Sequence, residues 1–176
     1  MMTKAQRKAF VFTLLLGTFT MSISQSSLST AYPTLMKFFN VDAPTIQWLT
    51  TGFMLIMCIM MPVSPWLLNN LSFKKMYLTV LAIFELGTLM IILAHNFPIA
   101  LLGRGLEAVA VGILFPSYQS VLMTITAKEG RAEVMGLAGL VMGSALACGP
   151  IISGIILNYI SWQGLFWFFL LVIALI

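Results

Sequence analysis

Long apolar runs separated by short polar segments dominate the pattern of hydrophobic and polar positions along the chain. The runs do not alternate apolar and polar residues, and most approach or exceed the ~20 residues that a helix needs to cross a bilayer. The pattern therefore predicts an all-α, polytopic membrane protein, because helices satisfy their own backbone hydrogen bonds in lipid. The predicted spans cover residues 10–31, 48–68, 76–94, 99–126, 134–160 and 164–176.

Polar and proline-containing breaks define the ends of these spans. Tyr32-Pro33 predicts the end of the first span, since proline lacks the backbone donor that a helix interior needs. The sixth run begins near Gly164 and is still apolar at Ile176. Because this is short of the ~20 residues of a full span, we expect an incomplete sixth helix. Residues 1–176 are then one transmembrane unit, a fragment of a longer protein or a truncated product.

Composition excludes several classes of protein. Hydrophobic residues make up 60% of the chain and charged residues 8%, whereas a soluble domain has roughly a quarter charged residues. Cys58 and Cys148 lie inside apolar runs without the spacing of a metal site, which indicates two buried thiols. The sequence has no phosphate-binding loop, metal-ligand cluster or nucleophile with a base partner. We therefore expect no enzymatic activity, no cofactor, no metal and no nucleic-acid partner.

The distribution of basic residues predicts the orientation in the membrane. Lys37 lies on one side of the predicted bundle, and Arg104 lies inside a span. The other Lys and Arg residues fall on the opposite side: Lys4, Arg7, Lys8, Lys74, Lys75, Lys128 and Arg131. Because basic loops stay in the cytoplasm, we expect a multi-pass protein of the cytoplasmic membrane with a cytoplasmic N-terminus.

Three charged residues within spans are candidates for chemistry, because charge is expensive in a bilayer. Glu85 lies in the third span, and Arg104 and Glu107 lie in the fourth. Residues three apart share a helix face, so Arg104 and Glu107 can pair. Such a carboxyl group can bind and release a proton as its access to water changes. The alternative is a static ion pair that holds two helices together.

The first span carries hydroxyl and amide side chains at spacings of four, three and four. On a helix these positions form one stripe, which predicts a wall of a water-filled cavity, with hydrogen bonding to a neighbouring helix as the alternative. The residues of this stripe are Thr18, Ser22, Gln25 and Ser29.

The fifth span carries a stripe of small residues. A face with few side chain atoms allows another transmembrane helix to approach closely. Gly149 and Pro150 add a flexible position and a missing backbone donor, which favour a bend. The pattern indicates either ordinary helix packing or a moving part. The stripe consists of Gly136, Gly139, Gly143, Ala147, Pro150 and Gly154.

Two of these segments carry a resemblance to a known family. The run from Gly139 through Gly143, Gly149 and Pro150 to Gly154 resembles the fifth-helix antiporter motif of the major facilitator superfamily. Arg104-Gly105-Leu106-Glu107, followed by Gly112, resembles the fourth-helix motif with a membrane-embedded arginine, where the family usually has Gln in place of Glu107. The chain is most similar to the N-terminal half of the drug:proton antiporters with fourteen transmembrane helices, the multidrug efflux group.

The chain departs from that family at two places. The loop after the second helix has Asn69 and Asn70 where the family has an acidic and a basic residue, which weakens the charge latch that the resemblance implies. In the first helix, Ser24 and the serines from Ser26 stand in a stretch where the family has an aspartate. We hypothesise that Glu85 or Glu107 compensates for the missing carboxylate.

The resemblance implies a bundle of two inverted three-helix repeats and proton-coupled export of amphipathic compounds. Arg104, Glu107 and Glu85 are then proton-coupling residues. The expected partners are the lipid bilayer, a small amphipathic substrate, protons, and a missing C-terminal half or a second copy. Two alternatives remain: a truncated membrane protein that acts through helix–helix contacts without transport, and half of a facilitator for another small solute.

Overall fold

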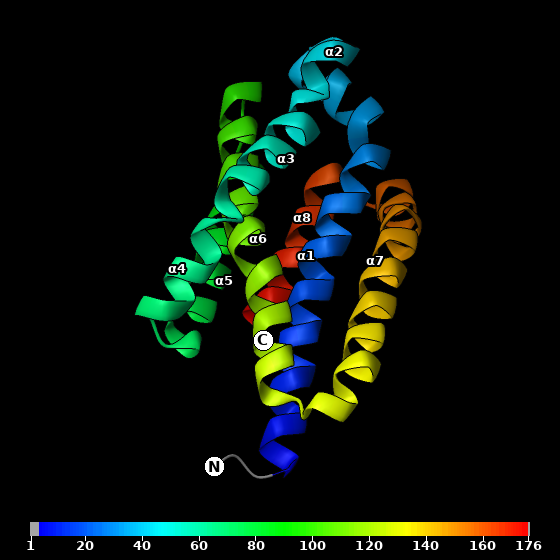
Figure 1. The fold of residues 1–176 in the computed structure, drawn as a ribbon. Coiled ribbons are helices and arrows are strands. Elements are labelled where there is room, and N and C mark those ends of the chain that lie inside the picture. Colours follow the sequence, from blue (N-terminus) through cyan, green and yellow to red (C-terminus); the bar gives the residue numbers. More distant parts are fainter. Residues whose placement is uncertain (1–3, 176) are drawn as a thin grey trace.

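The computed structural model describes residues 4–175, with side chains from Phe10 onward, and within this range every regular element is a helix (Figure 1). The predicted all-α class is confirmed. The basic side chains of Lys4, Arg7 and Lys8 and the last residue, Ile176, lie outside the described part. The elements are α1 (Lys4–Phe39), α2 (Ala43–Ile46), α3 (Trp48–Met60), α4 (Val63–Asn70), α5 (Phe73–Ile92), α6 (Phe97–Ile125), the 3-10 helix η1 (Lys128–Gly130), α7 (Arg131–Tyr159) and α8 (Trp162–Ala174).

The first helix is longer than the sequence predicts. The expected end at Tyr32-Pro33 was wrong, because α1 continues through Pro33 to Phe39. Leu35 is buried in a core cluster beyond the proline, so packing offsets the ~3 kcal/mol that an interior proline costs. The helix ends where Asn40 adopts a φ of 51° and the Val41 N–H donates to the Met36 carbonyl, which is a Schellman-type end.

The second predicted span, residues 48–68, is interrupted. Together α2 and α3 form a segment long and apolar enough to cross a membrane, but α3 ends at Met60 and α4 begins at Val63. Pro62 lies between them and has no backbone N–H to continue the helix. The N–H of Ser64 donates instead to the Met61 carbonyl across 3.2 Å. The span is therefore bent at a defined point.

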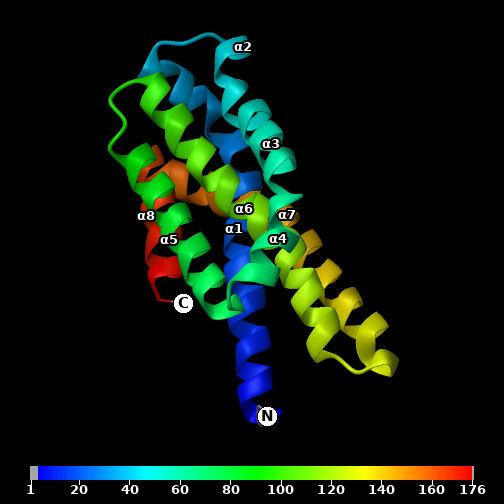
Figure 2. The same cartoon turned by 60° about the vertical axis from the view of Figure 1, so that its left-hand side comes forward.

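Helices that are far apart in the sequence lie side by side in the bundle. The first span, α1, lies along α7, while the fourth span, α6, lies along α3 and α4 of the second (Figures 1 and 2). The first span thus packs against the fifth, and the fourth packs against the second. This is the relation expected between two inverted three-helix repeats, in which the first span corresponds to the fourth and the second to the fifth. Helix α5 packs against α6, and α8 packs against α5 and α1.

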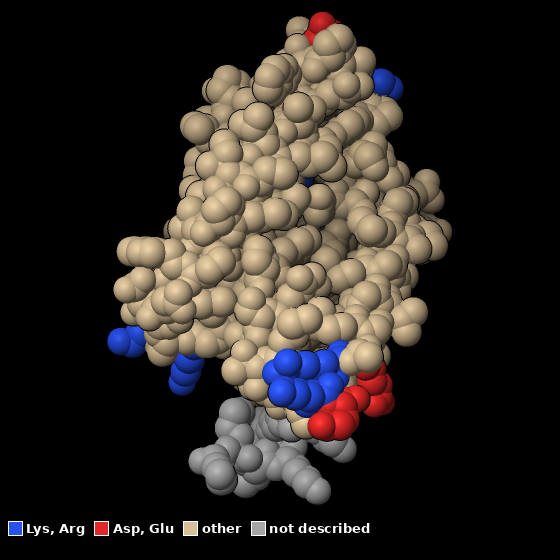
Figure 3. Space-filling view, viewed as in Figure 1, with Lys and Arg blue, Asp and Glu red and all other residues tan. Residues whose placement is uncertain are grey.

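The outer surface is apolar around the middle of the bundle. Large side chains such as Trp66, Leu140 and Ile151 are more than half exposed. In Figure 3, charged side chains gather at the two ends of the molecule, and the middle of the face is almost entirely uncharged. A protein with this surface belongs in lipid, where no hydrophobic penalty attaches to exposed apolar side chains.

The polar site lies between two apolar core clusters. Helix α6 passes through both: Ala100 belongs to the cluster around Leu35 and Phe166, and Ala108 belongs to the cluster around Phe84. Arg104 and Glu107 lie on α6 between these points. Both charged side chains are therefore enclosed by packed apolar residues along the helix.

Candidate functional site

Helix α6 supplies both charged members of the site. Its start is set by Asn96, whose Oδ1 accepts from the Ile99 N–H at 3.1 Å, with Pro98 in the first turn. Two turns further along, Arg104 Nη1 lies 2.5 Å from Glu107 Oε2. The exposed fractions of the two side chains are 2% and 0%. The structure thus joins the two residues whose spacing predicted a pair.

Each charged group also has a partner on a neighbouring helix. Thr88 of α5 donates from its hydroxyl to Glu107 Oε1 at 2.7 Å. The guanidinium carbon of Arg104 lies 4.2 Å from the ring centroid of Phe53 on α3, a cation–π contact. The site therefore connects the second, third and fourth spans. Sequence reasoning missed Thr88 and Phe53, because nothing in the spacing along one helix indicates which residues face it from another.

Two glycines bring α5 and α6 together beside the site. A Cβ atom added to Gly87 would lie 2.6 Å from the Gly103 carbonyl oxygen, and one added to Gly103 would lie 2.7 Å from the Gly87 carbonyl oxygen. The two backbones are thus in direct contact. Sequence reasoning also missed these positions, although a signal was present: Gly87 directly precedes Thr88, and Gly103 directly precedes Arg104.

A similar approach joins α6 to the second span. A Cβ atom on Gly112 would lie 2.6 Å from the Met57 carbonyl oxygen of α3. Past the break at Pro62, the hydroxyls of Ser64 on α4 and Ser117 on α6 lie 2.6 Å apart, and both side chains are fully buried. Both segments of the bent span are therefore attached to α6.

The third predicted charged residue, Glu85, lies apart from the pair. It is on α5, three residues before Thr88, and is partly buried. Its Oε1 atom is buried without a hydrogen-bond partner among the described residues. Glu85 makes no ion pair with Arg104 within that part of the chain. The structure brings two of the three charged candidates together.

The polar stripe of α1 is buried at one end and exposed at the other. Thr18 and Ser22 are buried, and each donates to a backbone carbonyl four residues earlier at 2.8 Å. Ser22 also lies 3.3 Å from the sulfur of Met142 on α7. Gln25 is partly exposed and Ser29 is exposed. Within this chain, only the last two positions offer polar groups to a surface.

The small residues of α7 do not pack as a stripe within the described residues. The close approach is at Gly149, where an added Cβ would collide with the Ser26 side chain of α1. Pro150, the next residue, is exposed, and the helix continues past it to Tyr159. A Cβ atom would meet nothing within 4 Å at the remaining glycines, which are Gly136, Gly139, Gly143 and Gly154.

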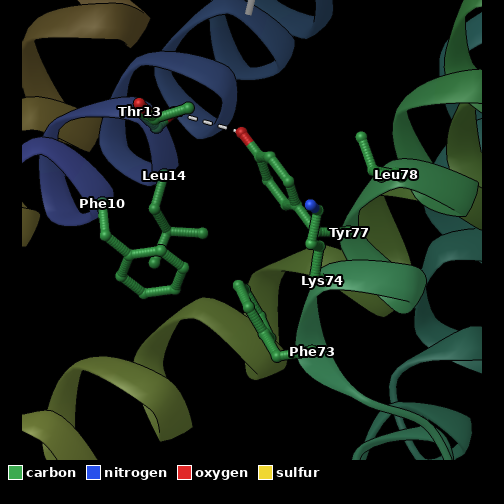
Figure 4. A pocket seen from close by; sticks show the side chains of 7 residues that line it. All are labelled: Phe10, Thr13, Leu14, Phe73, Lys74, Tyr77 and Leu78. Carbon is green, nitrogen blue, oxygen red and sulfur yellow. Dashed lines mark hydrogen bonds between the residues drawn. The ribbon is translucent and has the colours of Figure 1, made fainter. Parts of the chain in front are cut away.

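A separate groove lies between α1 and α5, at the end of the bundle where α5 begins (Figure 4). Its volume is about 350 Å³ and its walls are mainly apolar. The hydroxyl of Tyr77 points across it and donates to the Thr13 carbonyl at 3.1 Å. None of the site residues of α6 contributes to it. The lining residues are Phe10, Thr13, Leu14, Phe73, Lys74, Tyr77 and Leu78.

Comparison with known protein families agrees with the helical membrane architecture. The family model of the Major Facilitator Superfamily matches residues 14–176. The chain belongs to this superfamily. It is therefore a multi-pass membrane protein of a transporter family, and Arg104, Glu107 and both core clusters lie within the matched residues.

Several relatives carry the names of transporters or of a drug-resistance protein. The chain is 40% identical over 164 residues to the uncharacterized MFS-type transporter YcnB of Bacillus subtilis, covering 93% of this chain and 35% of YcnB. It is 36% identical over 168 residues to the lincomycin resistance protein LmrB of the same organism, covering 94% and 35%. The riboflavin transporter RibZ of Clostridioides difficile is 25% identical over 161 residues, covering 92% and 35%. The chain spans about a third of the length of these relatives.

Proposed function

We propose that this chain forms the N-terminal half of a proton-coupled transporter that exports amphipathic compounds. The assignment is to the drug:proton antiporters with fourteen transmembrane helices. The observation that carries it is the buried pair of Arg104 and Glu107 within a span. The relationship to a lincomycin resistance protein supports the export of drug-like substrates.

The chemistry of the pair supports coupling to protons. An arginine in a protein does not lose its proton, so Glu107 is the member whose charge changes. Protonation of Glu107 changes the net charge of the pair from zero to plus one at a site where the two side chains are only 2% and 0% exposed. A change of charge at a buried site shifts the balance between two conformations that differ in their access to water. A static ion pair has no such second state.

The remaining parts of the transporter are assigned by their exposure. Gln25 and Ser29 on α1 contribute polar groups to the substrate cavity, with Thr18 and Ser22 next to them. The exposed glycine face of α7 receives a helix of a C-terminal half or of a second copy. Lys74, Lys75, Lys128 and Arg131 mark the cytoplasmic end, so the N-terminus is in the cytoplasm and the protein lies in the cytoplasmic membrane.

Efflux measured against an imposed proton gradient tests this function in the protein that contains this chain. Glu107→Gln is expected to remove the dependence of efflux on pH, because a glutamine cannot accept the proton. Glu85→Gln tests the second carboxyl group in the same assay. Glu133→Gln is the matched control, since Glu133 is exposed in the first turn of α7. Unchanged pH dependence in both the Glu107 and Glu85 variants would sink the proposal.

A second candidate is a membrane protein that acts through helix–helix contact without transport. The open face at Gly139 and Gly143 favours it, because nothing in the described chain covers these residues. A cysteine introduced by Gly143→Cys would form a cross-link if two copies pair through this face. Cross-linking combined with absent efflux supports this candidate over the transporter.

A further inference from the structure

The hydroxyl of Thr88 lies within hydrogen-bond distance of two acceptors. Its oxygen is 2.7 Å from Glu107 Oε1 and 3.0 Å from the Phe84 carbonyl oxygen. A threonine hydroxyl has one hydrogen to donate and two lone pairs with which to accept. When Glu107 is ionised, the two contacts therefore share a single hydrogen. One more proton, placed between Thr88 and Glu107, would give each of the two contacts its own hydrogen.

We propose that Thr88 is the positioning residue for the proton at Glu107, an inference that rests on the proposed coupling function. In the ionised state, Thr88 donates its hydrogen to the Glu107 carboxylate. In the protonated state, Glu107 Oε1–H donates to Thr88, and the Thr88 hydrogen turns to the Phe84 carbonyl. The carboxyl group thus has the same partner in both states.

The exchange balances without any other group. One proton binds to Glu107 Oε1 and forms a new O–H bond there. The Thr88 O–H bond rotates from Oε1 toward the Phe84 carbonyl, and no other covalent bond changes. Glu107 Oε2 continues to accept from Arg104 Nη1, which lies 2.5 Å away. The oxygens of Glu107 and Thr88 therefore keep hydrogen-bond partners through proton uptake, while Arg104 Nε is buried without a hydrogen-bond partner among the described residues.

The charged and titratable groups around Glu107 are few. On α6 itself Arg104 is the ion-pair partner, and Tyr118 lies further along the helix. Helix α5 contributes Glu85 and Tyr77, the latter bonded to Thr13, and carries Lys74 and Lys75 in its first turn. Of the other helices packed against α6, α3 contributes Cys58, α4 contributes none, and α1 contributes none between Phe10 and Ala31. Helix α7 has Arg131 and Glu133 in its first turn and Cys148 in its interior. A titration of the site is therefore governed by Glu107 and its direct contacts.

Thr20 shows what an ordinary buried threonine does in this bundle. Its hydroxyl donates to the Leu16 carbonyl four residues earlier at 2.9 Å, and its exposed fraction is 4%. Thr88 makes the same local bond to Phe84 but has the carboxyl group in addition. Thr20→Val therefore controls for the loss of a buried hydroxyl that is bonded to its own helix.

Infrared difference spectroscopy of the full chain in lipid nanodiscs tests the role of Thr88. The carbonyl stretching band of protonated Glu107 is assigned by its loss in Glu107→Gln. In Thr88→Val the acid has lost its acceptor, so the band is expected to shift to higher wavenumber. Thr88→Ser keeps the hydroxyl and should restore the position of the wild-type band, while Thr20→Val should leave it unchanged. Thr88→Ala replaces the valine variant if valine prevents folding.

Three results would overturn the proposal: an unshifted band in Thr88→Val, an equal shift in Thr20→Val, or no protonated Glu107 band at any pH at which the chain stays folded. The pH profile of efflux separates this inference from the transport function. A shifted band together with pH-independent efflux would retain Thr88 as the partner of Glu107 and remove the coupling. An unshifted band together with efflux that depends on Glu107 would retain the coupling function and remove Thr88 as the positioning residue.

Discussion

Helices α6 and α7 both carry several glycines, but these glycines have opposite surroundings in the structure. Gly103 and Gly112 of α6 lie against the backbones of α5 and α3, where no Cβ atom fits. Gly139 and Gly143 of α7 face open space. A glycine pattern therefore indicates where another backbone is able to approach, and leaves open whether the approaching helix belongs to the same bundle.

The difference follows from the polar residues between the glycines. On α6, Arg104 and Glu107 need partners in a medium without water, and the close contacts of Gly87 with Gly103 bring Thr88 within reach. The exposed face of α7 has no charged residue between Glu133 and Tyr159 and makes no such demand. Close packing around α6 is thus part of the polar site, whereas the α7 face is free to receive a partner.

Among the variants that test this comparison, removal of the buried cation should change the stability of the fold most. Arg104→Met leaves Glu107 buried without its charge partner, which is expected to destabilise the fold by about 3–5 kcal/mol. Arg131→Met, at the exposed start of α7, is the matched control, with a change within about 0.5 kcal/mol. Thermal unfolding in detergent, followed by circular dichroism, measures both. Equal stability of the two variants would mean that the buried pair contributes no more than a surface residue.

The second prediction concerns the glycines themselves. Gly103→Ala places a methyl group 2.7 Å from the Gly87 carbonyl oxygen, so the helices must separate, at a cost of about 1–3 kcal/mol. Gly139→Ala meets nothing within 4 Å and removes backbone freedom from a helix, which stabilises it by up to ~1 kcal/mol. The two variants should therefore shift the unfolding temperature in opposite directions. A fall of similar size in Gly139→Ala would show that another helix already covers the α7 face.

The sequence predicted the parts of this comparison that depend on one helix. Arg104 and Glu107 were recognised as a pair, because residues three apart share a face on any helix. Thr88 and Phe53 were not, because the rotation of α5 and α3 toward α6 depends on packing between helices. The end expected at Pro33 failed for the same reason: the burial of Leu35 beyond the proline outweighs a local preference.

The small-residue stripe of α7 was recognised as a surface for close packing, and its outward orientation was not. Helical periodicity places Gly136, Gly139 and Gly143 on one side of the helix but does not say which side faces α1. Contacts with α1 determine the orientation. The Ser26 hydroxyl donates to the Ala145 carbonyl of α7, and its side chain lies so close to Gly149 that a Cβ atom there would collide with it. Contacts of this kind depend on two helices at once and lie beyond periodicity along one.

The smallest expected effect comes from the hydroxyls. Ser64→Ala removes the bond at 2.6 Å between α4 and buried Ser117, at a cost of about 1 kcal/mol, since Ser117 retains its bond to the Ile113 carbonyl. Ser144→Ala on α7 removes an exposed bond to the Val141 carbonyl and should change stability by less than about 0.5 kcal/mol. Chemical unfolding of both variants beside wild type measures the difference. If the Ser64 variant is as stable as the Ser144 variant, the Ser64–Ser117 bond does not contribute to holding the bent second span against α6, and the contrast between the two regions is confined to the charged pair, its direct contacts and its glycines.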